Sequence, residues 1–142
     1  MRSPIVSLQQ LDSDLSVSNL WAAAKLCLQM GRLNQSLTIA YSAAQQDPTQ
    51  QQLYKNHYVE VVKLGAEFAE EIGDYSRAAY YWEQLTQQLP QDASAWHGLG
   101  LAKANLQDYR GAEMALNKCL QLEPENQKAR SHFIEIQQML KG

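Results

Sequence analysis

Hydrophobic and polar positions follow a pattern that is repeated along the chain. Three stretches each end at a proline, Pro48, Pro90 and Pro124, and the last two prolines lie 34 residues apart. When the stretches are aligned on these prolines, residues of the same type fall at the same places. A period of this length is typical of stacked helix pairs. We therefore expect helices near residues 17–30, 34–46, 51–72, 76–89, 93–106, 110–122 and 127–140.

The aligned positions separate into small and large residues. Small residues stand where the two helices of a pair must cross closely: Ala24, Ala66 and Gly100 in the first helices, and Ser36, Ala78 and Ala112 in the second. Large apolar residues are expected to fill the space between helices: Leu20, Val62 and Trp96; Leu26 and Phe68; Met30, Ile72 and Leu106; Leu33, Tyr75 and Tyr109. Burial of Trp82, Trp96 and Phe68 is expected to stabilise the fold, and alanine at either tryptophan to destabilise it by about 3 to 5 kcal/mol.

The middle stretch is longer than the others. Pro48 and Pro90 are 42 residues apart, eight more than the period, and only one glycine and no proline interrupt residues 51–71. The simplest interpretation is a first helix about two turns longer than normal. Its extra part places Tyr54, His57 and Tyr58 on one face. No neighbouring helix is expected to cover that face, so either the N-terminal arm or a partner would do so.

The third stretch resembles the tetratricopeptide repeat (TPR), through Trp96, Leu99, Gly100, Tyr109, Ala112, Leu116 and Pro124. Gly31 and Gly73 fit the turns inside the pairs, whereas Gln107 and Lys103 depart from the pattern, the latter where the family usually has an aromatic residue. The resemblance implies an all-α fold, a right-handed TPR superhelix or α-solenoid of about seven helices. It divides the chain into an N-terminal arm, 1–16, and a TPR domain, 17–142, with repeats 17–50, 51–92 and 93–126 and a capping helix, 127–140.

Composition agrees with one domain and limits the partners. The chain has 142 residues, of which 45% are hydrophobic, 19% are charged and 18 are glutamine. A net charge of −3 without a cluster of lysine or arginine argues against nucleic-acid binding. The sequence has neither an export signal nor a run long enough to span a membrane, which favours a cytoplasmic location. Cys27 and Cys119 fall at inward-facing repeat positions, where free thiols behave as small hydrophobes.

The resemblance also implies a groove lined by the first helix of each pair. By alignment, its candidate residues are Trp21, Lys25 and Gln29; Lys63, Glu67, Glu70 and Glu71; and His97, Leu101 and Asn105, with Lys128 and His132 extending the row. The carboxylates at its middle would suit a partner segment with basic or amide-rich residues, although a solvated helix face would look the same. Tyrosine is common at protein interfaces. Four tyrosines therefore suggest a second binding surface: Tyr54, Tyr58, Tyr80 and Tyr81.

The sequence gives little support for an enzymatic function. No catalytic motif or phosphate loop is present, and no cofactor, catalytic residue or metal site is expected. His97 and His132, 35 residues apart, could approach each other across adjacent helices, but two imidazoles alone make a weak metal site. The lysine, asparagine and arginine clamp with which chaperone-binding TPR proteins hold a terminal carboxylate is poorly matched, because the corresponding Trp21, Lys25, Leu64, Ser94 and Gly98 supply one cation.

The expected function is therefore binding of another protein, through a peptide or a helix, by an adaptor or assembly factor. A small secretion-type or client-specific chaperone and a regulatory or anchoring module of a larger protein are the alternatives. The apolar residues of the N-terminal arm, Ile5, Val6, Leu8 and Leu11, suggest that it folds onto the long helix near Tyr54 and Tyr58 or exchanges with a second copy to form a homodimer.

Overall fold

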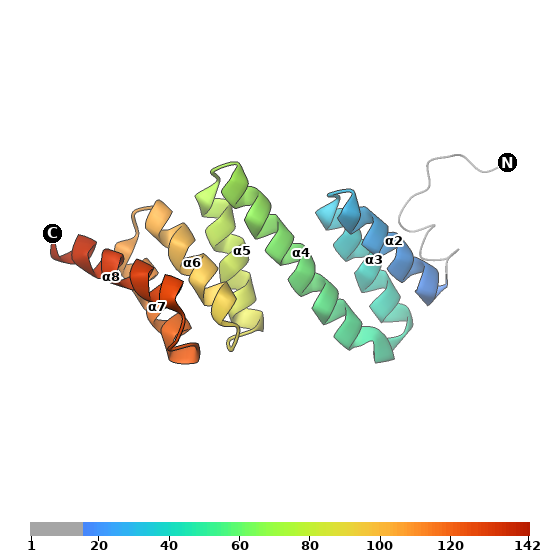
Figure 1. Cartoon of the computed structure of the whole chain (residues 1–142). Helices are drawn as coiled ribbons and strands as arrows, with labels where there is room; N and C mark the ends of the chain where they lie inside the picture. Colours follow the sequence, from blue (N-terminus) through green and yellow to red (C-terminus); the bar gives the residue numbers. More distant parts are fainter. Residues whose placement is uncertain (1–15) are drawn as a thin grey trace. The chain divides into compact units, whose positions relative to one another are not determined.

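The computed structural model describes residues 16–142. Of the N-terminal arm, 1–16, only Ser16 is described, and the hypothesis about the arm therefore lies outside the described residues. Residues 16–142 form seven α-helices and one short 3-10 helix, and they contain no strand. The elements are α2 (Val17–Gln29), α3 (Leu33–Gln46), η1 (Pro48–Gln50), α4 (Gln51–Glu71), α5 (Tyr75–Gln88), α6 (Ala93–Asn105), α7 (Tyr109–Leu122) and α8 (Gln127–Lys141), as labelled in Figure 1. The expected helices, including the long α4, are confirmed to within one or two residues.

The chain divides into two compact units at Val61. In the described part of the first unit, α2 and α3 pack against each other over a core of Leu20, Ala24, Ile39 and Ala40. The side chain of Ser16 caps α2 by accepting a hydrogen bond from the Asn19 amide at 3.3 Å. This hairpin is thus closed by small and aliphatic residues, as the spacing of its apolar positions requires.

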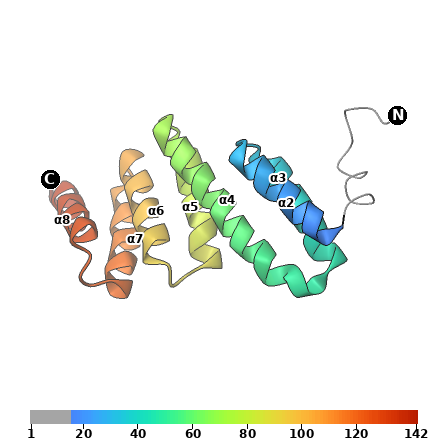
Figure 2. The same ribbon diagram turned by 45° about the vertical axis from the view of Figure 1, so that its right-hand side comes forward.

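The second unit, Val62–Gly142, contains the end of α4 and all of α5 to α8. Helix α5 packs on α6, α6 on α7 and α7 on α8, and these rods follow one another in Figure 1 and Figure 2. Helix α6 also contacts α8, which follows it by two elements. The core between α7 and its neighbours includes Ala112, Leu116, Cys119, Ala129 and Ile136. The contact between α6 and α8 places these two helices side by side, and a cleft forms there.

The turns inside the three pairs share one backbone conformation. Gly31, Gly73 and Gln107 all have positive φ, at 76°, 77° and 63°. This left-handed region is natural for glycine and strained for a residue with a Cβ atom. The third turn therefore keeps the geometry of the other two although its sequence lacks the glycine.

The expected close crossings are confirmed. Ala24, Ser36, Ala66, Ala78 and Ala112 are fully buried. Gly100 is also buried, and a Cβ atom there would come within 2.8 Å of the Leu116 side chain. Small residues at these positions allow the helix axes to approach.

Several of the large apolar residues expected in the core are exposed instead: Leu26, Met30, Phe68, Ile72 and Leu106. Phe68 is 61% exposed, and Trp96 is only half-buried, whereas Trp82 is buried at 7%. On α4 the reason is that two apolar stripes exist. The buried stripe uses the smaller Val62, Ala66 and Ala69, and Phe68 lies on the other. The expectation that Phe68 is a core residue is wrong.

Candidate functional site

A cleft of about 230 Å³ opens between α6 and α8, and we call it the α6–α8 cleft. It is lined by residues of three helices: Leu101, Ala104, Asn105, Tyr109, His132, Glu135, Ile136 and Met139. Two of the three groove residues predicted on α6, Leu101 and Asn105, are among them. The third, His97, lies one turn before Leu101 on the same helix face and contacts His132.

Helix caps hold the two walls of the α6–α8 cleft in place. Asp92 caps α6 by accepting a hydrogen bond from the Ser94 amide at 3.0 Å. Asn126 caps α8 in the same way, accepting from the Ala129 amide at 3.0 Å. Such caps satisfy amides that have no partner within their own helix. Buried Ile136 then fixes α8 against the core, so that the polar residues on either side of it face the cleft or the solvent.

His97 and His132 form the polar end of this wall. Nε2 of His97 lies 3.1 Å from Nδ1 of His132, a hydrogen bond in which one ring donates and the other accepts. The expected approach of these residues across the repeat is thus confirmed. Burial lowers the pKa of His97, and the neighbouring His132 and Lys128 lower it further, against a smaller opposing effect of Glu123. The charged form of His97 is accordingly disfavoured.

Among the remaining polar groups of the α6–α8 cleft, Asn105 and Glu135 supply acceptors, whereas the Tyr109 hydroxyl can donate or accept. The Asn105 amide nitrogen donates to the Leu101 carbonyl at 2.9 Å, which leaves its Oδ1 atom able to accept. Glu135 adds a carboxylate at the same edge. The walls between them are apolar, from Leu101, Ile136 and Met139. A ligand group that suits this cleft has an apolar body and carries hydrogen-bond donors.

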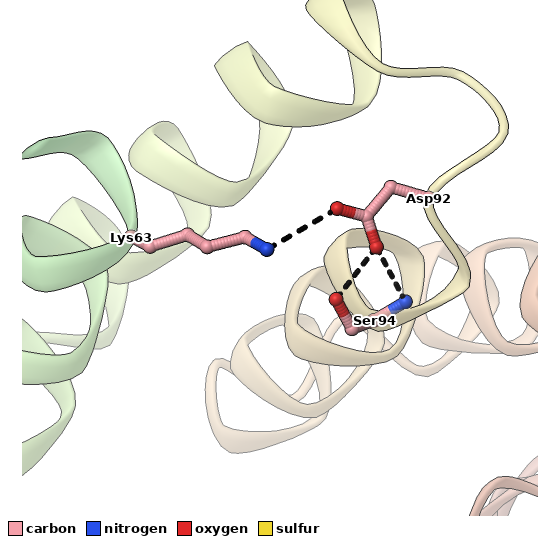
Figure 3. A network of polar contacts seen from close by, with 3 residues as sticks. All are labelled: Lys63, Asp92 and Ser94. Carbon is pink, nitrogen blue, oxygen red and sulfur yellow. Dashed lines mark hydrogen bonds and ion pairs between the residues drawn. The ribbon is translucent and has the colours of Figure 1, made fainter. Parts of the chain in front are cut away.

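Two of the predicted groove residues on α4 are held within the second unit. Lys63 pairs with Asp92 at 3.3 Å, and Asp92 also accepts the Ser94 hydroxyl at 2.6 Å (Figure 3). Burial alone would raise the pKa of Asp92, but the hydrogen bond from Ser94 and the charge of Lys63 outweigh it and lower that pKa. Glu70 accepts the indole N–H of Trp82 at 2.6 Å. Glu67 and Glu71 are exposed, so they are the carboxylates open to a partner.

In the first unit, His57 is buried at 5% exposure, which corrects the expectation that its face of α4 is uncovered. The Ser36 hydroxyl donates to the Ala24 carbonyl at 2.7 Å, so it must accept the proton of His57 Nε2 at 2.6 Å. Trp21 lies edge-on to this imidazole, with the ring centroids 6.0 Å apart. Of the other groove residues predicted in this unit, Lys25 and Gln29 are exposed on α2.

The four tyrosines of the predicted second surface lie in different surroundings. The ring of Tyr54 lies edge-on to that of Tyr41, with the ring centroids 5.9 Å apart. It is tilted relative to the ring of Tyr58, with the centroids 6.4 Å apart. On α5, Tyr80 is 60% exposed. Tyr81 covers Gly65, where a Cβ atom would lie 3.1 Å from its ring. The structure thus gives Tyr81 a packing role, whereas Tyr41 joins Tyr54 and Tyr58.

Sequence reasoning missed several residues that line the α6–α8 cleft. Tyr109 was assigned only to the core, and Glu135 was not singled out. The signal existed in the spacing of His132, Glu135, Ile136 and Met139, which share one helix face at intervals of three and four. Within residues 16–142, no three His, Cys, Asp or Glu side chains gather as they would around a metal ion. None of the helices described is both long and apolar enough to cross a membrane.

Comparison with known sequences concerns part of the chain. Residues 93–126 match the sequence model of the tetratricopeptide repeat. The PEX5-related proteins of Mus musculus and Homo sapiens are 39% identical to the chain over 57 residues, which is 40% of the chain. The match covers 10% of the mouse protein and 9% of the human protein, so it spans about a tenth of the length of these relatives.

Solved structures resemble nearly the whole chain. The C-terminal TPR-containing domain of a Plasmodium falciparum FK506-binding protein has a TM-score of 0.63 at 16% identity, with 96% of this chain and 94% of that one covered. The first TPR domain of Spaghetti (RPAP3), bound to the HSP90 peptide SRMEEVD, has a TM-score of 0.58 at 17% identity, with 99% and 100% covered. MamA has a TM-score of 0.60 at 15% identity, with 94% and 70% covered. Identities this low concern the fold alone.

Proposed function

Because the chain is a helical repeat protein with the tetratricopeptide-repeat fold, we propose that it is an adaptor or assembly factor that holds a peptide or helix of another protein. The observation that carries this proposal is the α6–α8 cleft, where Leu101 and Asn105, predicted from the repeat alone, meet a wall supplied by α8. The fold-related RPAP3 domain, solved with a peptide, supports this mode of binding. A preformed cleft leaves most of the ordering cost to the ligand segment.

The chemistry of the cleft indicates what kind of segment would bind. Its apolar walls suit a leucine, methionine or similar side chain, and the Asn105 and Glu135 oxygens accept hydrogen bonds from the ligand. Exposed Glu67 and Glu71 add negative charge to the same unit. The partner segment is therefore basic or rich in amides and carries an apolar anchor. An acidic segment such as SRMEEVD would bind this cleft weakly.

The occupant of this cleft decides between the three roles expected from the sequence. A client-specific chaperone or an anchoring module of a longer protein would use the same cleft, and neither has an observation of its own in its favour. The expected cytoplasmic location and the use of Tyr54, Tyr58 and Tyr80 as a second interface belong to the same proposal.

A matched pair of substitutions on α8 tests the proposal. Met139 and Ile134 are both exposed apolar residues, but only Met139 lines the cleft. Arrays of synthetic peptides that combine an apolar anchor with basic, neutral or acidic neighbours would be screened against the full chain. The best basic peptide would then be titrated by fluorescence anisotropy. We expect Met139→Arg to weaken it by at least about tenfold and Ile134→Arg to leave it unchanged.

Two results would reject the proposed site. One is equal binding of the best basic peptide by the wild-type protein and Met139→Arg, and the other is binding of that peptide that Glu135→Lys does not weaken. A separate experiment, affinity capture from cells followed by mass spectrometry, would identify the partner. The wild-type protein is compared there with a variant that combines Glu67→Lys and Glu71→Lys in the groove. Glu125→Lys serves as a control of the same charge on the exposed loop before α8.

A further inference from the structure

A second cleft, of about 360 Å³, lies between α6 and α7, and we call it the α6–α7 cleft. Its residues on α6 are Trp96, Leu99 and Lys103, whereas the α6–α8 cleft uses Leu101 and Asn105. At about 100° per residue, these two sets point roughly 170° apart around the helix. The two clefts therefore open on nearly opposite sides of α6.

The walls of the α6–α7 cleft combine a fixed side chain and an adaptable one. The Trp96 indole N–H donates to the Pro90 carbonyl at 2.9 Å, which holds the half-buried ring in place. Opposite it, Met114 is 73% exposed, although an apolar side chain of this size is normally covered. Buried Leu99 and Ala115 form the floor. A rigid aromatic wall facing a flexible thioether suits an apolar side chain brought by a partner.

An unusual residue stands at position 103, beside the open space. In the two preceding repeats, the equivalent positions are Cys27 and Ala69, and both are buried. Lys103 replaces them with a cation whose amine turns outward to Asp108, 3.5 Å away. This exposed pair is weak, and it uses a carboxylate that already caps α7. The third repeat therefore has a charge where the others complete their core.

The charged residues that line the α6–α7 cleft are all positive. Its lining contains two ammonium groups, those of Lys103 and Lys118, and no carboxylate. Lys118 has no ion-pair partner within residues 16–142. An apolar space flanked by two cations is complementary to an apolar side chain flanked by anions.

We propose that the α6–α7 cleft is a second docking surface, which binds an acidic amphipathic segment of a partner protein. One leucine or methionine of that segment enters between Trp96 and Met114. Glutamate or aspartate residues next to it pair with Lys103 and Lys118. The segment differs in charge from the basic or amide-rich one proposed for the α6–α8 cleft. The two surfaces can therefore succeed or fail independently, and together they would let one molecule hold two partners.

The test uses two synthetic 14-residue peptides with the same leucine positions, one with glutamate and one with lysine at the remaining sites. Each is titrated into the full chain at low salt, with fluorescence anisotropy for affinity and amide NMR shifts for location. We expect the glutamate peptide to shift the amides of Met114 and Lys118, and the lysine peptide to leave them unshifted. Lys118→Glu should weaken binding of the glutamate peptide by at least about tenfold, and Lys141→Glu, at the end of α8, should leave it unchanged.

Filling the cleft is the second arm of the test. Lys103→Phe should place a ring in the apolar space and reduce binding of the glutamate peptide by about tenfold, while the circular dichroism spectrum stays helical. If Lys118→Glu does not fold, Lys118→Gln takes its place, with an expected loss of about threefold.

Five results would overturn the proposal. Four of them are unchanged binding of the glutamate peptide by Lys118→Glu, amide shifts confined to the α6–α8 cleft, unchanged binding by Lys103→Phe, and displacement of the peptide by decanoate at a lower concentration. The last would assign the cleft to a small acyl carboxylate. A doubled mass in light scattering that Lys118→Glu abolishes would assign it to a second copy of this chain and would equally reject an acidic partner.

Discussion

The indole of Trp82 on α5 lies directly against the backbone of Gly98 on α6, with no room for a Cβ atom between them. The ring is held there by the hydrogen bond from its N–H to Glu70. Gly98 corresponds to one of the clamp positions that bind a terminal carboxylate in chaperone-binding TPR proteins. Here no cationic side chain fits at that position, because the indole occupies its space.

Replacing Gly98 with alanine should therefore destabilise the protein. Inside an exposed helix this change usually stabilises by about 0.5 to 1 kcal/mol. At position 98 the added methyl group would overlap the buried ring of Trp82, so we expect a loss of about 1 to 3 kcal/mol. Urea unfolding followed by circular dichroism measures this difference.

Gly65→Ala is the matched control. Its Cβ atom would meet the ring of Tyr81 at 3.1 Å, but Tyr81 is half-exposed and can move. Its loss should be the smaller of the two. A double variant, Gly98→Ala with Trp82→Leu, should be more stable than the sum of the single changes predicts. Strict additivity would contradict a direct clash between the two residues.

The strained turn at Gln107 predicts a stabilising substitution. Gln107 has a φ of 63°, a conformation that disfavours side chains by about 1 to 2 kcal/mol, whereas glycine adopts it without strain. Since glycine also gains freedom in the unfolded chain, the net gain from Gln107→Gly should be about 0.5 to 1 kcal/mol.

The reverse change at an equivalent turn provides the control. Gly73 has a φ of 77° and open space where its Cβ atom would lie, so Gly73→Gln should destabilise through backbone strain alone. We expect a loss of about 1 kcal/mol in thermal or chemical unfolding. Opposite signs for the two variants support the argument, and a destabilising Gln107→Gly would refute it.

Asp92 has two roles that substitution can separate. It caps α6 through the Ser94 amide, and it pairs with Lys63 (Figure 3). Asp92→Asn keeps a capping oxygen and removes the charge, so it should lower stability by less than about 1 kcal/mol. Asp92→Ala removes both roles and should lower it by about 1 to 2 kcal/mol. If Lys63→Gln alone matches Asp92→Ala, the ion pair rather than the cap is the dominant contribution.

Acid should destabilise the fold through its buried imidazoles. Burial lowers the pKa of His57 below 6.5, with a smaller raising effect from Glu60 and a smaller lowering effect from Lys25. The unfolded chain then binds the proton at a higher pH than the folded chain does. The free energy of unfolding should be highest above about pH 6.5 and should fall as the pH drops toward the lowered value. The lowered pKa of His97 acts in the same direction.

Urea titrations between pH 5 and 8 measure this dependence. The double variant His57→Gln and His97→Gln should be less stable but should show a flatter pH profile over that range. A wild-type profile that is flat, or that rises toward acid, would show that these imidazoles take up protons in the folded state as readily as in the unfolded one.

The helices and close crossings could be predicted because they depend on period and residue size. Gly100 and Ala112 recur in the alignment with their counterparts, and all are buried. The meeting of His97 and His132 was predictable for the same reason, since their separation is one period plus one residue. Information of this kind is local or periodic, and a single sequence contains it.

Whether an individual side chain faces the core or the solvent could be predicted less well. Helix α4 has two apolar stripes, and periodicity alone does not tell that the one with Phe68 is exposed. Trp96 aligns with buried Leu20 and Val62 but is only half-buried, so Trp96→Ala should cost less than the 3 to 5 kcal/mol expected from the sequence. Glu70 was assigned to the groove, but it accepts a hydrogen bond from Trp82. That contact depends on how α4 and α5 pack, which a single sequence does not reveal.

Each compact unit contains one concealed thiol, Cys27 in the first and Cys119 in the second. Burial raises the pKa of Cys119, which suppresses its thiolate as well as its access to reagents. Alkylation of either cysteine must then wait until the surrounding helices part. The rates of labelling at the two sites, read by mass spectrometry of the native chain, would therefore time the opening of each half separately without any introduced probe.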